Sequence, residues 1–312
     1  MKLCIATGLS GFLGSHILRL AHDYPELSFV SLDRADKSVF TPSLELLLLD
    51  RINIDQDDHI LCNKLKSLAV NFSDITFLHL ASVSRQNEST PDGIRSIYNY
   101  NVAESLRLSA ICIDSGVSHI LSIGSSWQFA SHEESKRFVN HYAISKHCFE
   151  LGLERLVLDA MVGCSLIYLY DNFGAMDTRN KIVDLVLAAL DQSRRLDMSP
   201  GKQILDISPV QYQARLILES VLKSENLSVR LGEPNHISRF LICGHRIILE
   251  QLVALISRIC QLPSPVNFGG RPYRPNEIMD PIYPFPRLFS STVTLPDLAL
   301  SLESYISKRG IN

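Results

Sequence analysis

A glycine-rich turn directly behind the first apolar segment constrains the fold of this chain more than any other feature. Leu3–Thr7 predicts a short buried strand, and glycines at three-residue intervals, Gly8, Gly11 and Gly14, lead from it into a helix-like segment at 15–21. Strand, glycine turn and helix in this order set free N–H groups at a helix N-terminus against a phosphate. The pattern predicts an α/β protein with a doubly wound parallel sheet, although the spacing meets the dinucleotide fingerprint only approximately.

An acidic residue closes the second predicted strand. Leu27–Asp33 ends 19 positions after the third glycine, where a carboxylate can accept hydrogen bonds from an adenosine ribose 2′-hydroxyl. Asp33 therefore favours NAD. The next residue, Arg34, can instead pair with the 2′-phosphate of NADP, so both cofactors stay open. A third predicted strand, Glu45–Asp50, places Asp50 either near the adenine or in a solvated loop.

Two further strands deliver small and hydroxyl side chains to the same edge of the sheet. Phe77–Ser82 predicts a fourth strand, and the small residues at its end let a cofactor lie close to the backbone. His79 within it is expected to be a core histidine. His119–Ser126 predicts a fifth strand that ends in Ser125 and Ser126. Ligands of open parallel sheets bind outside the carboxyl ends of the strands, so both serines face the crevice that holds the glycine turn.

A tyrosine and a lysine four residues apart follow the fifth strand. Tyr142 and Lys146 lie on one face of a predicted helix, so the phenol and the ammonium can point into one pocket. A free tyrosine has a pKa of about 10, and an adjacent cation lowers it. The pair can then act as a general acid or base. With a hydroxyl from a strand end beside it, the pair can hold and protonate a carbonyl and orient a nicotinamide.

The order of these motifs resembles a known family. Thr7-Gly8-x-x-Gly11-Phe12-x-Gly14, Leu80-Ala81, Ser125 and Tyr142-x-x-x-Lys146 follow one another as in the extended short-chain dehydrogenase/reductases, the NAD-dependent epimerase/dehydratase family. The resemblance covers essentially the whole chain. It implies a Rossmann fold that binds NAD or NADP, with a smaller C-terminal lobe for a nucleotide-sugar.

The resemblance also implies roles for individual residues. Tyr142 would be the acid/base, and Lys146 would bind the nicotinamide ribose and lower the pKa of the tyrosine. Ser125, or Ser126 as the alternative, would orient the substrate oxygen. The predicted cofactor contacts are Gly8, Gly11, Phe12, Gly14, Asp33, Arg34, Asp50, Leu80, Ala81, Ser82, Asn101, Tyr142 and Lys146.

Five stretches are similar to one branch of that family. They resemble bacterial sugar-nucleotide reductases of the CDP-abequose and CDP-paratose synthase type, and lie at 124–128, 142–150, 169–181, 198–206 and 270–279. Arginine forks suit a diphosphate, and the predicted substrate contacts are Asp171, Arg179, Lys181, Arg271 and Arg274. Ile207–Gln211 departs from the family pattern because it lacks the paired acids that often follow this strand, which puts some lobe contacts in doubt.

These residues predict a ketoreductase that uses NAD(P)H to reduce a nucleotide-linked 4-keto sugar or deoxysugar, with Tyr142 as the proton donor. A dehydratase is disfavoured. In the pattern that dehydratases of this fold resemble, Asp-Glu follow the catalytic hydroxyl, whereas Ser126-Trp127 stand at that place here. An epimerase needs the same triad and is the main alternative. A protein that senses the NAD(P) ratio without turnover is less favoured, because such sensors often lose the tyrosine or lysine that this chain keeps.

The composition disfavours several other classes. A formal charge of −3 with scattered Lys and Arg indicates no nucleic-acid binder and no membrane surface. No apolar run is long enough for a membrane span, and the N-terminal run is too short for a signal peptide. Seven widely spaced Cys suit reduced thiols, and no Cys or His cluster indicates a metal. We expect a cytoplasmic protein, and the resemblance implies a homodimer through the apolar helices 94–114 and 142–158.

The second half predicts a lobe rather than an independent domain. We expect residues 1–170 to form the Rossmann domain, to which 205–245 return, and 171–204 with 246–312 to form the lobe. Strands are predicted at 165–170 and 240–243, and helices at 181–190, 211–223 and 249–260. The proline-rich run 263–296 predicts irregular structure.

Overall fold

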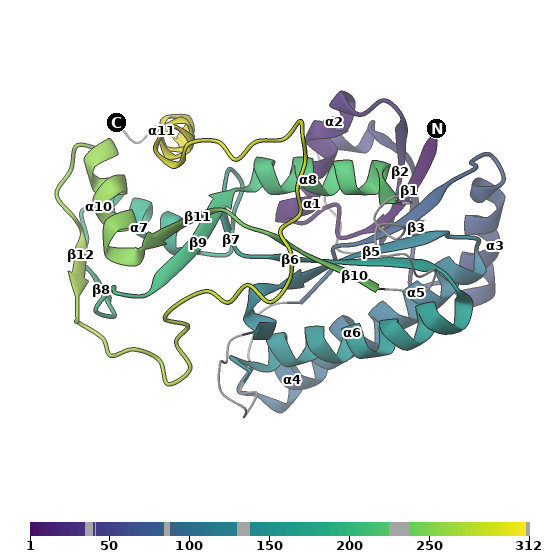
Figure 1. The fold of residues 1–312 in the computed structure, drawn as a ribbon, viewed down its shortest axis with the longest axis horizontal. Helices are drawn as coiled ribbons and strands as arrows, with labels where there is room; N and C mark the ends of the chain where they lie inside the picture. The colour runs from purple at the N-terminus through teal and green to yellow at the C-terminus, as the bar shows by residue number, and fades with distance from the viewer. Residues whose placement is uncertain (35–39, 41, 84–87, 130–137, 225–236, 310–312) are drawn as a thin grey trace.

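The structure is a computed structural model that describes residues 1–34, 40, 42–83, 88–129, 138–224 and 237–309. A seven-stranded sheet in the order β10-β6-β5-β4-β1-β2-β3 forms its centre, and every adjacent pair is parallel (Figure 1). The strands are β1 (Lys2–Thr7), β2 (Leu27–Asp33), β3 (Leu48–Asn53), β4 (Ile75–His79), β5 (His119–Ser125), β6 (Gly163–Leu169) and β10 (Ile237–Ile242). This sheet confirms the predicted Rossmann fold.

The direction in which the sheet grows reverses at β1. This strand pairs with β2 on one side and with β4 on the other, so a crevice opens beyond the carboxyl ends of β1 and β4. Every residue of β1 is buried, as expected for a central parallel strand that is covered on both faces. The glycine turn that follows β1 therefore lies at the edge of this crevice.

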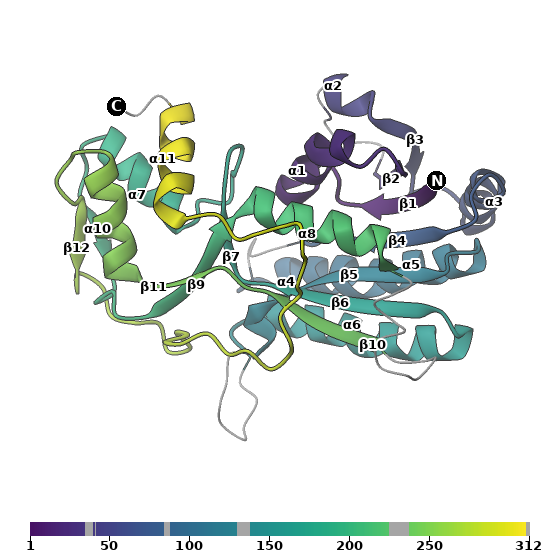
Figure 2. The ribbon, with the colours of Figure 1, turned by 45° about the horizontal axis from the view of Figure 1, so that its top comes forward.

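Helices cover both faces of the sheet. One face carries α1 (Phe12–Leu20), the short helices η1 (Ala21–Asp23) and α2 (Pro42–Glu45), and α8 (Val210–Leu222) (Figure 2). The other carries α3 (Asp58–Ala69), α4 (Pro91–Tyr98), α5 (Ser105–Asp114) and α6 (His141–Ala160), with a π-helical turn, η2 (Asn99–Glu104), between α4 and α5. Each layer has its own hydrophobic core, the first around Ile17 and Ile217 and the second around Leu61, Leu108 and Phe149.

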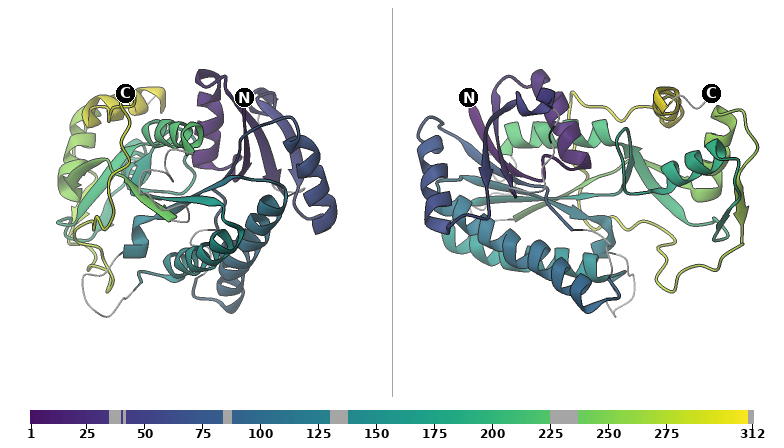
Figure 3. Two further views of the ribbon diagram at one scale, coloured as in Figure 1. Left: turned by 45° about the vertical axis from the view of Figure 1, so that its right-hand side comes forward. Right: turned by 180° about the vertical axis from the view of Figure 1, so that it is seen from behind.

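A smaller lobe follows the end of β6 and lies to one side of the Rossmann unit (Figures 1 and 3). It holds a three-stranded sheet, β11-β9-β7, and a strand pair, β12-β8. Its strands are β7 (Asp171–Phe173), β8 (Leu196–Met198), β9 (Ile204–Pro209), β11 (His245–Ile248) and β12 (Val266–Phe268). Its helices are α7 (Ile182–Asp191), α10 (Leu249–Ile259) and α11 (Leu298–Arg309), and these pack around a third hydrophobic core.

The third strand starts later than predicted. Residues 42–45 form α2, and β3 begins at Leu48. The run of leucines did not mark a buried strand, because β3 is the edge of the sheet and Leu49 is 52% exposed. Asn53 rather than Asp50 is therefore the β3 residue beside Asp33 at the end of β2.

The second half of the chain crosses between the two units more often than the sequence predicts. β9 pairs with β7 and β11 in the lobe sheet, so the chain re-enters the Rossmann unit at α8 rather than at residue 205. The proline-rich run contains β12 and then returns to β10, where Leu241 N donates to Pro286 O at 2.9 Å and Leu288 N to Leu241 O at 2.8 Å. The helix α11, which the sequence pattern did not predict, then closes the lobe.

Three further properties concern the described residues. No helix among them is long and apolar enough to cross a membrane. All seven cysteines are free, and five of them are buried. Within the same ranges, no three His, Cys, Asp or Glu side chains lie close enough together to hold a metal ion.

Candidate active site

The three glycines of the first turn differ in how closely other atoms surround them. Gly8 has φ +74°, and a Cβ there would lie 2.8 Å from Ala81 N, so the turn approaches the end of β4 closely. A Cβ on Gly14 would lie 2.2 Å from Gly8 O. Around Gly11, Gly8 O is the one described atom within 4 Å of such a Cβ, at 3.2 Å. The fold itself thus needs Gly8 and Gly14, while Gly11 leaves open space at the N-terminus of α1, where a pyrophosphate would sit.

The residues at the end of β2 fit an adenosine ribose. Asp33 is 8% exposed, burial raises the pKa of its carboxyl, and its Oδ2 accepts no hydrogen bond from the described residues. Nε of Arg51 lies 3.5 Å from that oxygen. The Cζ of Arg34 lies 3.6 Å from the centre of the Tyr100 ring. Beside this ion pair with Arg51, the buried carboxylate oxygen keeps the capacity to accept from the ribose hydroxyls of NAD.

Asp50 and Asn101 both have partners within the protein. Asp50 lies three residues before the end of β3, where it pairs with Lys64 at 3.3 Å. The amide of Asn101 is held within the protein, since its Nδ2 donates to Val83 O and to Ser145 Oγ, both at 2.9 Å. Its Oδ1 accepts from Val83 N at 2.7 Å. Asn101 therefore fixes the segment after β4 against α6 instead of donating to a cofactor.

His79 is a core residue, as the sequence predicts. Its Nδ1 lies 2.8 Å from Thr7 Oγ1, and Ala81 N donates to the same hydroxyl at 3.2 Å. Burial lowers the pKa of His79 to about 3, with a further contribution from the charge of Lys146. A neutral histidine here links the ends of β1 and β4 and so holds Leu80 and Ala81 against the glycine turn.

Tyr142 lies in the first turn of α6. The side chain of Asn140 caps this helix by accepting from Ala143 N at 2.9 Å. Burial raises the pKa of Tyr142, and hydrogen bonds from Ser82 and Ser125, together with the charge of Arg179, act in the opposite direction. The sequence predicted a lowered pKa for this phenol. The structure differs from this prediction, because burial outweighs both the hydrogen bonds and the charge of Arg179, and the pKa of Tyr142 stays raised.

Lys146 lies one turn deeper in α6. Its side chain is buried, and its Nζ donates to Ile123 O at 3.0 Å. Burial lowers the pKa of Lys146 to about 8. The ammonium is therefore anchored on β5, two residues before the end of that strand.

An aromatic side chain occupies the position beside Tyr142 where the dehydratase pattern has an acid. Ser126–Phe129 form a 3₁₀ turn, η3, after β5, and the Trp127 ring meets the Tyr142 ring edge to face, with centroids 6.3 Å apart. Nζ of Lys181 lies 4.9 Å above the indole and 3.5 Å from Asp171. Ser126 lines the adjacent cavity, while Ser125 contacts the tyrosine. Of the two serines, Ser125 is therefore the one that the structure brings to Tyr142.

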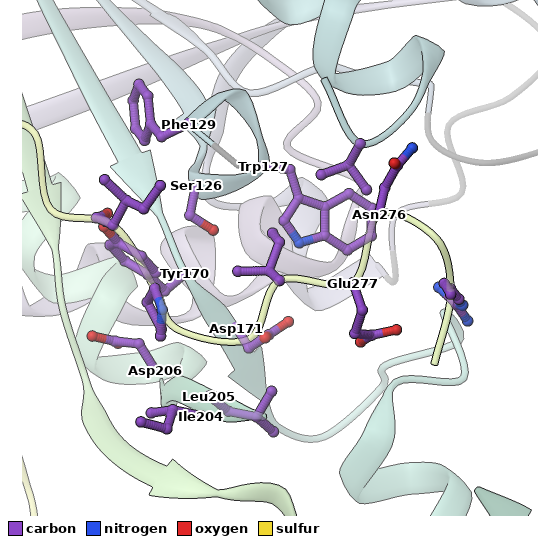
Figure 4. A pocket seen from close by; sticks show the side chains of 15 residues that line it. Ser126, Trp127, Phe129, Tyr170, Asp171, Ile204, Leu205, Asp206, Asn276 and Glu277 are labelled. Atoms are coloured by element: carbon purple, nitrogen blue, oxygen red, sulfur yellow. The ribbon is translucent and has the colours of Figure 1, made fainter. Parts of the chain in front are cut away.

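A cavity of about 150 Å³ opens between η3, the end of β6 and the lobe (Figure 4). Trp127, Phe129 and Tyr170 line it, together with residues of the segment 274–282. Of the predicted substrate residues, Asp171 and Arg274 line it. Arg271 is exposed and does not line it. Asp206, which sequence reasoning did not single out, also lines the cavity and binds the Tyr283 hydroxyl at 2.8 Å.

Arg179 lies between the glycine turn and the tyrosine. Its Cζ is 4.2 Å from the centre of the Phe12 ring, and its Nη2 donates to Asn172 Oδ1 and to Asp177 Oδ2, each at 2.6 Å. Asn172 in turn donates to Gln213 Oε1 at 2.7 Å. Sequence reasoning missed this chain of amides. The one feature of the sequence that could have indicated these hydrogen bonds is the presence of polar residues among the apolar ones of β7 and α8.

A phenol, a hydroxyl and a buried lysine thus stand where a Rossmann sheet binds its dinucleotide, as in NAD-dependent oxidoreductases. The model of the NAD dependent epimerase/dehydratase family matches residues 4–224, and the chain belongs to this family. CDP-abequose synthase from Yersinia pseudotuberculosis is 27% identical over 185 residues, which are 58% of this chain and 61% of that protein.

Solved structures share the fold. The dTDP-glucose 4,6-dehydratase DesIV from Streptomyces venezuelae, with NAD bound, has a TM-score of 0.74 at 18% identity, covering 100% of this chain and 98% of that one. The UDP-glucuronic acid 4-epimerase from Bacillus cereus, bound to UDP-glucuronic acid and NAD, has a TM-score of 0.73 at 16% identity, covering 99% and 100%. At these identities the likeness shows the fold alone.

Proposed function

We propose that the protein reduces the 4-keto group of a nucleotide-linked sugar with NADH. The observation that carries this proposal is the indole of Trp127 against Tyr142, at a centroid distance of 6.3 Å. A dehydratase needs a second acid–base group beside its tyrosine, and here the charge that acts on Tyr142 is that of Arg179, a cation. One proton donor is enough for adding a hydride and a proton to a ketone.

The chain's residues have separate tasks in this reaction. Bound NADH supplies a hydride to the carbonyl carbon. Tyr142 gives its phenolic proton to the carbonyl oxygen, which becomes a hydroxyl, and solvent then reprotonates the phenolate. Ser125 donates a hydrogen bond to the oxygen as charge develops on it. Burial keeps Tyr142 protonated near neutrality, which suits the direction of reduction.

The cavity supports a nucleotide-linked deoxysugar as substrate. Its wall is aromatic at Trp127, Phe129 and Tyr170, and an apolar wall suits a sugar carbon that lacks a hydroxyl. The cations Arg274 and Lys181 stand at or beside the same cavity and suit a diphosphate. The similarity to a CDP-abequose synthase supports a CDP-sugar.

We further propose that NADH is preferred over NADPH. Asp33 is buried, and its Oδ2, which pairs with Arg51 at 3.5 Å, can still accept from a ribose hydroxyl, whereas a 2′-phosphate would meet this carboxylate. Arg34, which could bind that phosphate, is engaged with Tyr100. NADH should bind about tenfold or more tightly than NADPH, as measured by calorimetry.

The proposed reaction is tested with NADH and 4-keto-6-deoxyglucose linked to CDP, dTDP or UDP. Loss of NADH absorbance together with a new 4-hydroxy product is expected with the CDP-sugar. Tyr142→Phe should lower the rate by about a hundredfold or more while NADH still binds. Tyr98→Phe, which removes a hydroxyl next to His141 on the same helical layer, is the matched control and should keep the rate. Interconversion of two sugars without loss of NADH would instead identify an epimerase.

We also propose a cytoplasmic homodimer that buries α5 and α6. Leu151 and Leu158 on α6 are one heptad apart and are 54% and 45% exposed, and Met161 after the helix is 76% exposed. Apolar side chains along one helical face suit a partner helix. Leu151→Glu should give a monomer in light scattering, and a variant that keeps the mass of the parent would contradict this interface.

A further inference from the structure

A chain of buried polar side chains joins the catalytic serine to the helix of Tyr142. Ser125 N donates to Gln128 Oε1 at 2.9 Å, and Gln128 Nε2 donates to Glu150 Oε2 at 3.1 Å. Gln128 and Glu150 are each 8% exposed. The other oxygen of Glu150 accepts from the Tyr168 hydroxyl at 2.7 Å and from Arg239 Nε at 3.0 Å. Each link is a hydrogen bond of ordinary length, and Gln128 and Glu150 make theirs in an environment with little water.

The two ends of this chain belong to the two elements that carry the triad. Glu150 follows Lys146 by four residues and Tyr142 by eight, so all three lie along one face of α6. Ser125 is the last residue of β5, and Gln128 lies in the turn η3 that follows it. The Gln128 amide thus crosses the gap between η3 and α6 and fixes one against the other.

We propose that Gln128 is a positioning residue that sets Ser125 at its working distance from Tyr142. The inference rests on the proposed function, in which Ser125 and Tyr142 act on one carbonyl oxygen. An amide suits this position because it accepts from Ser125 N at one end and donates to a carboxylate at the other. A carboxylate at position 128 would instead face Glu150 with like charge.

Loss of the bridge has a specific consequence for catalysis. The hydroxyl of Ser125 is held from the turn by Trp127 N, at 3.3 Å, and it contacts the Tyr142 hydroxyl. If the turn shifts, the Ser125 hydroxyl can no longer contact both the Tyr142 hydroxyl and the carbonyl oxygen of the substrate. A misplacement of about 1 Å can lower a rate by about a hundredfold. The hydrogen bond from Ser125 lowers the pKa of Tyr142, so its loss moves that pKa upward.

The test compares Gln128→Met with Tyr168→Phe. Gln128→Met keeps the length of the side chain and removes both amide groups. Tyr168→Phe removes another hydrogen bond to Glu150, which keeps Arg239 as a partner, and leaves the bridge to Ser125 intact. We expect Gln128→Met to lower kcat by about tenfold to a hundredfold, with KM for the sugar within about threefold. The alkaline limb of its rate profile should move to higher pH, and Tyr168→Phe should change neither quantity.

Gln128→Asn provides a second variant if the methionine variant does not fold. It keeps the amide but is one methylene too short to reach both partners, so it should show the same fall in kcat. A kcat and a pH profile like those of the parent in a folded Gln128 variant, or equal changes in Tyr168→Phe, would overturn the proposal. Either result is independent of which sugar the parent reduces.

A measurement without substrate separates this proposal from the proposed function. Amide hydrogen exchange at Ser125 should be about tenfold faster in Gln128→Met than in the parent, because its N–H loses a buried acceptor. The same amide should exchange at the parental rate in Tyr168→Phe. If the parent reduces no sugar, the proposed function is refuted, but the exchange rate still tests the role of Gln128. An unchanged exchange rate at Ser125 in Gln128→Met would refute that role.

Discussion

The Rossmann unit and the lobe differ in what holds them together. In the Rossmann unit the backbone itself sets the constraints, as at Gly8 with its φ of +74° and at Gly14, whose Cβ would meet a carbonyl at 2.2 Å. The lobe has short strands, and its closure depends on side chains from distant parts of the chain, such as Asp184 of α7 with Tyr305 of α11. The cofactor half is therefore constrained by close backbone packing, and the substrate half by side-chain contacts between distant segments.

The largest effect is expected where the backbone is most crowded. Gly14→Ala should lower the free energy of unfolding by about 3 kcal/mol, because the added Cβ meets Gly8 O and Leu9 Cα within 2.4 Å and cannot be accommodated by a side-chain rotation. Urea denaturation measures the loss. Gly11→Ala is the control, with φ −76° and one neighbour at 3.2 Å, and should change stability by less than about 1 kcal/mol. Equal losses in both variants would remove the distinction between the two glycines.

The next effect concerns binding rather than folding. Gly11→Val should weaken NADH binding by about a hundredfold or more, because its side chain would fill the space in which the pyrophosphate meets the N-terminus of α1. The melting temperature without ligand should change little, since the surrounding protein leaves that space open. Calorimetry with NADH measures the loss, and unchanged binding would show that the phosphates lie elsewhere.

Most of the site residues that the sequence places correctly in the fold lie in the Rossmann unit. The places of the glycine turn, of Asp33 and Ser125 at strand ends, and of the Tyr142–Lys146 pair on one helix were predictable, because local patterns indicate turns, strand ends and helical spacing. The contacts of Asp50 and Asn101 were not predictable. Those of Asp50 depend on where the edge strand β3 begins, and those of Asn101 depend on the π-helical turn η2. The raised pKa of Tyr142 depends on burial, which spacing cannot show. The Gln128 bridge joins residues that are 22 positions apart, and no local pattern indicates it.

A moderate effect is expected from the contact that closes the lobe. Tyr305→Phe removes a hydrogen bond of 2.6 Å to the buried Asp184, whose other oxygen already has no partner among the described residues. Unfolding free energy should fall by about 2 kcal/mol, and affinity for the nucleotide-sugar should fall while NADH affinity stays the same. Tyr273→Phe, whose hydroxyl accepts from Lys202 N near the surface, is the control and should have a smaller effect. An equal loss of NADH affinity would show that the two units are not separable.

The smallest effect is expected for Asp33, and it tests whether a residue that binds the cofactor lowers the stability of the fold. Burial raises the folded-state pKa of Asp33 above its unfolded value, so its contribution to stability is fully present below the unfolded pKa and is lost as pH rises through the folded one. At neutral pH the ionised carboxylate is therefore a cost, and Asp33→Asn should raise the unfolding free energy there by about 1 kcal/mol while changing little at acidic pH. The same variant should weaken NADH more than NADPH, because an amide repels a 2′-phosphate less than a carboxylate does. Denaturation at two pH values and calorimetry with both cofactors measure these changes. A variant that is less stable at neutral pH, or that keeps the parental ratio of the two affinities, would mean that Asp33 is a structural partner of Arg51 rather than the ribose ligand.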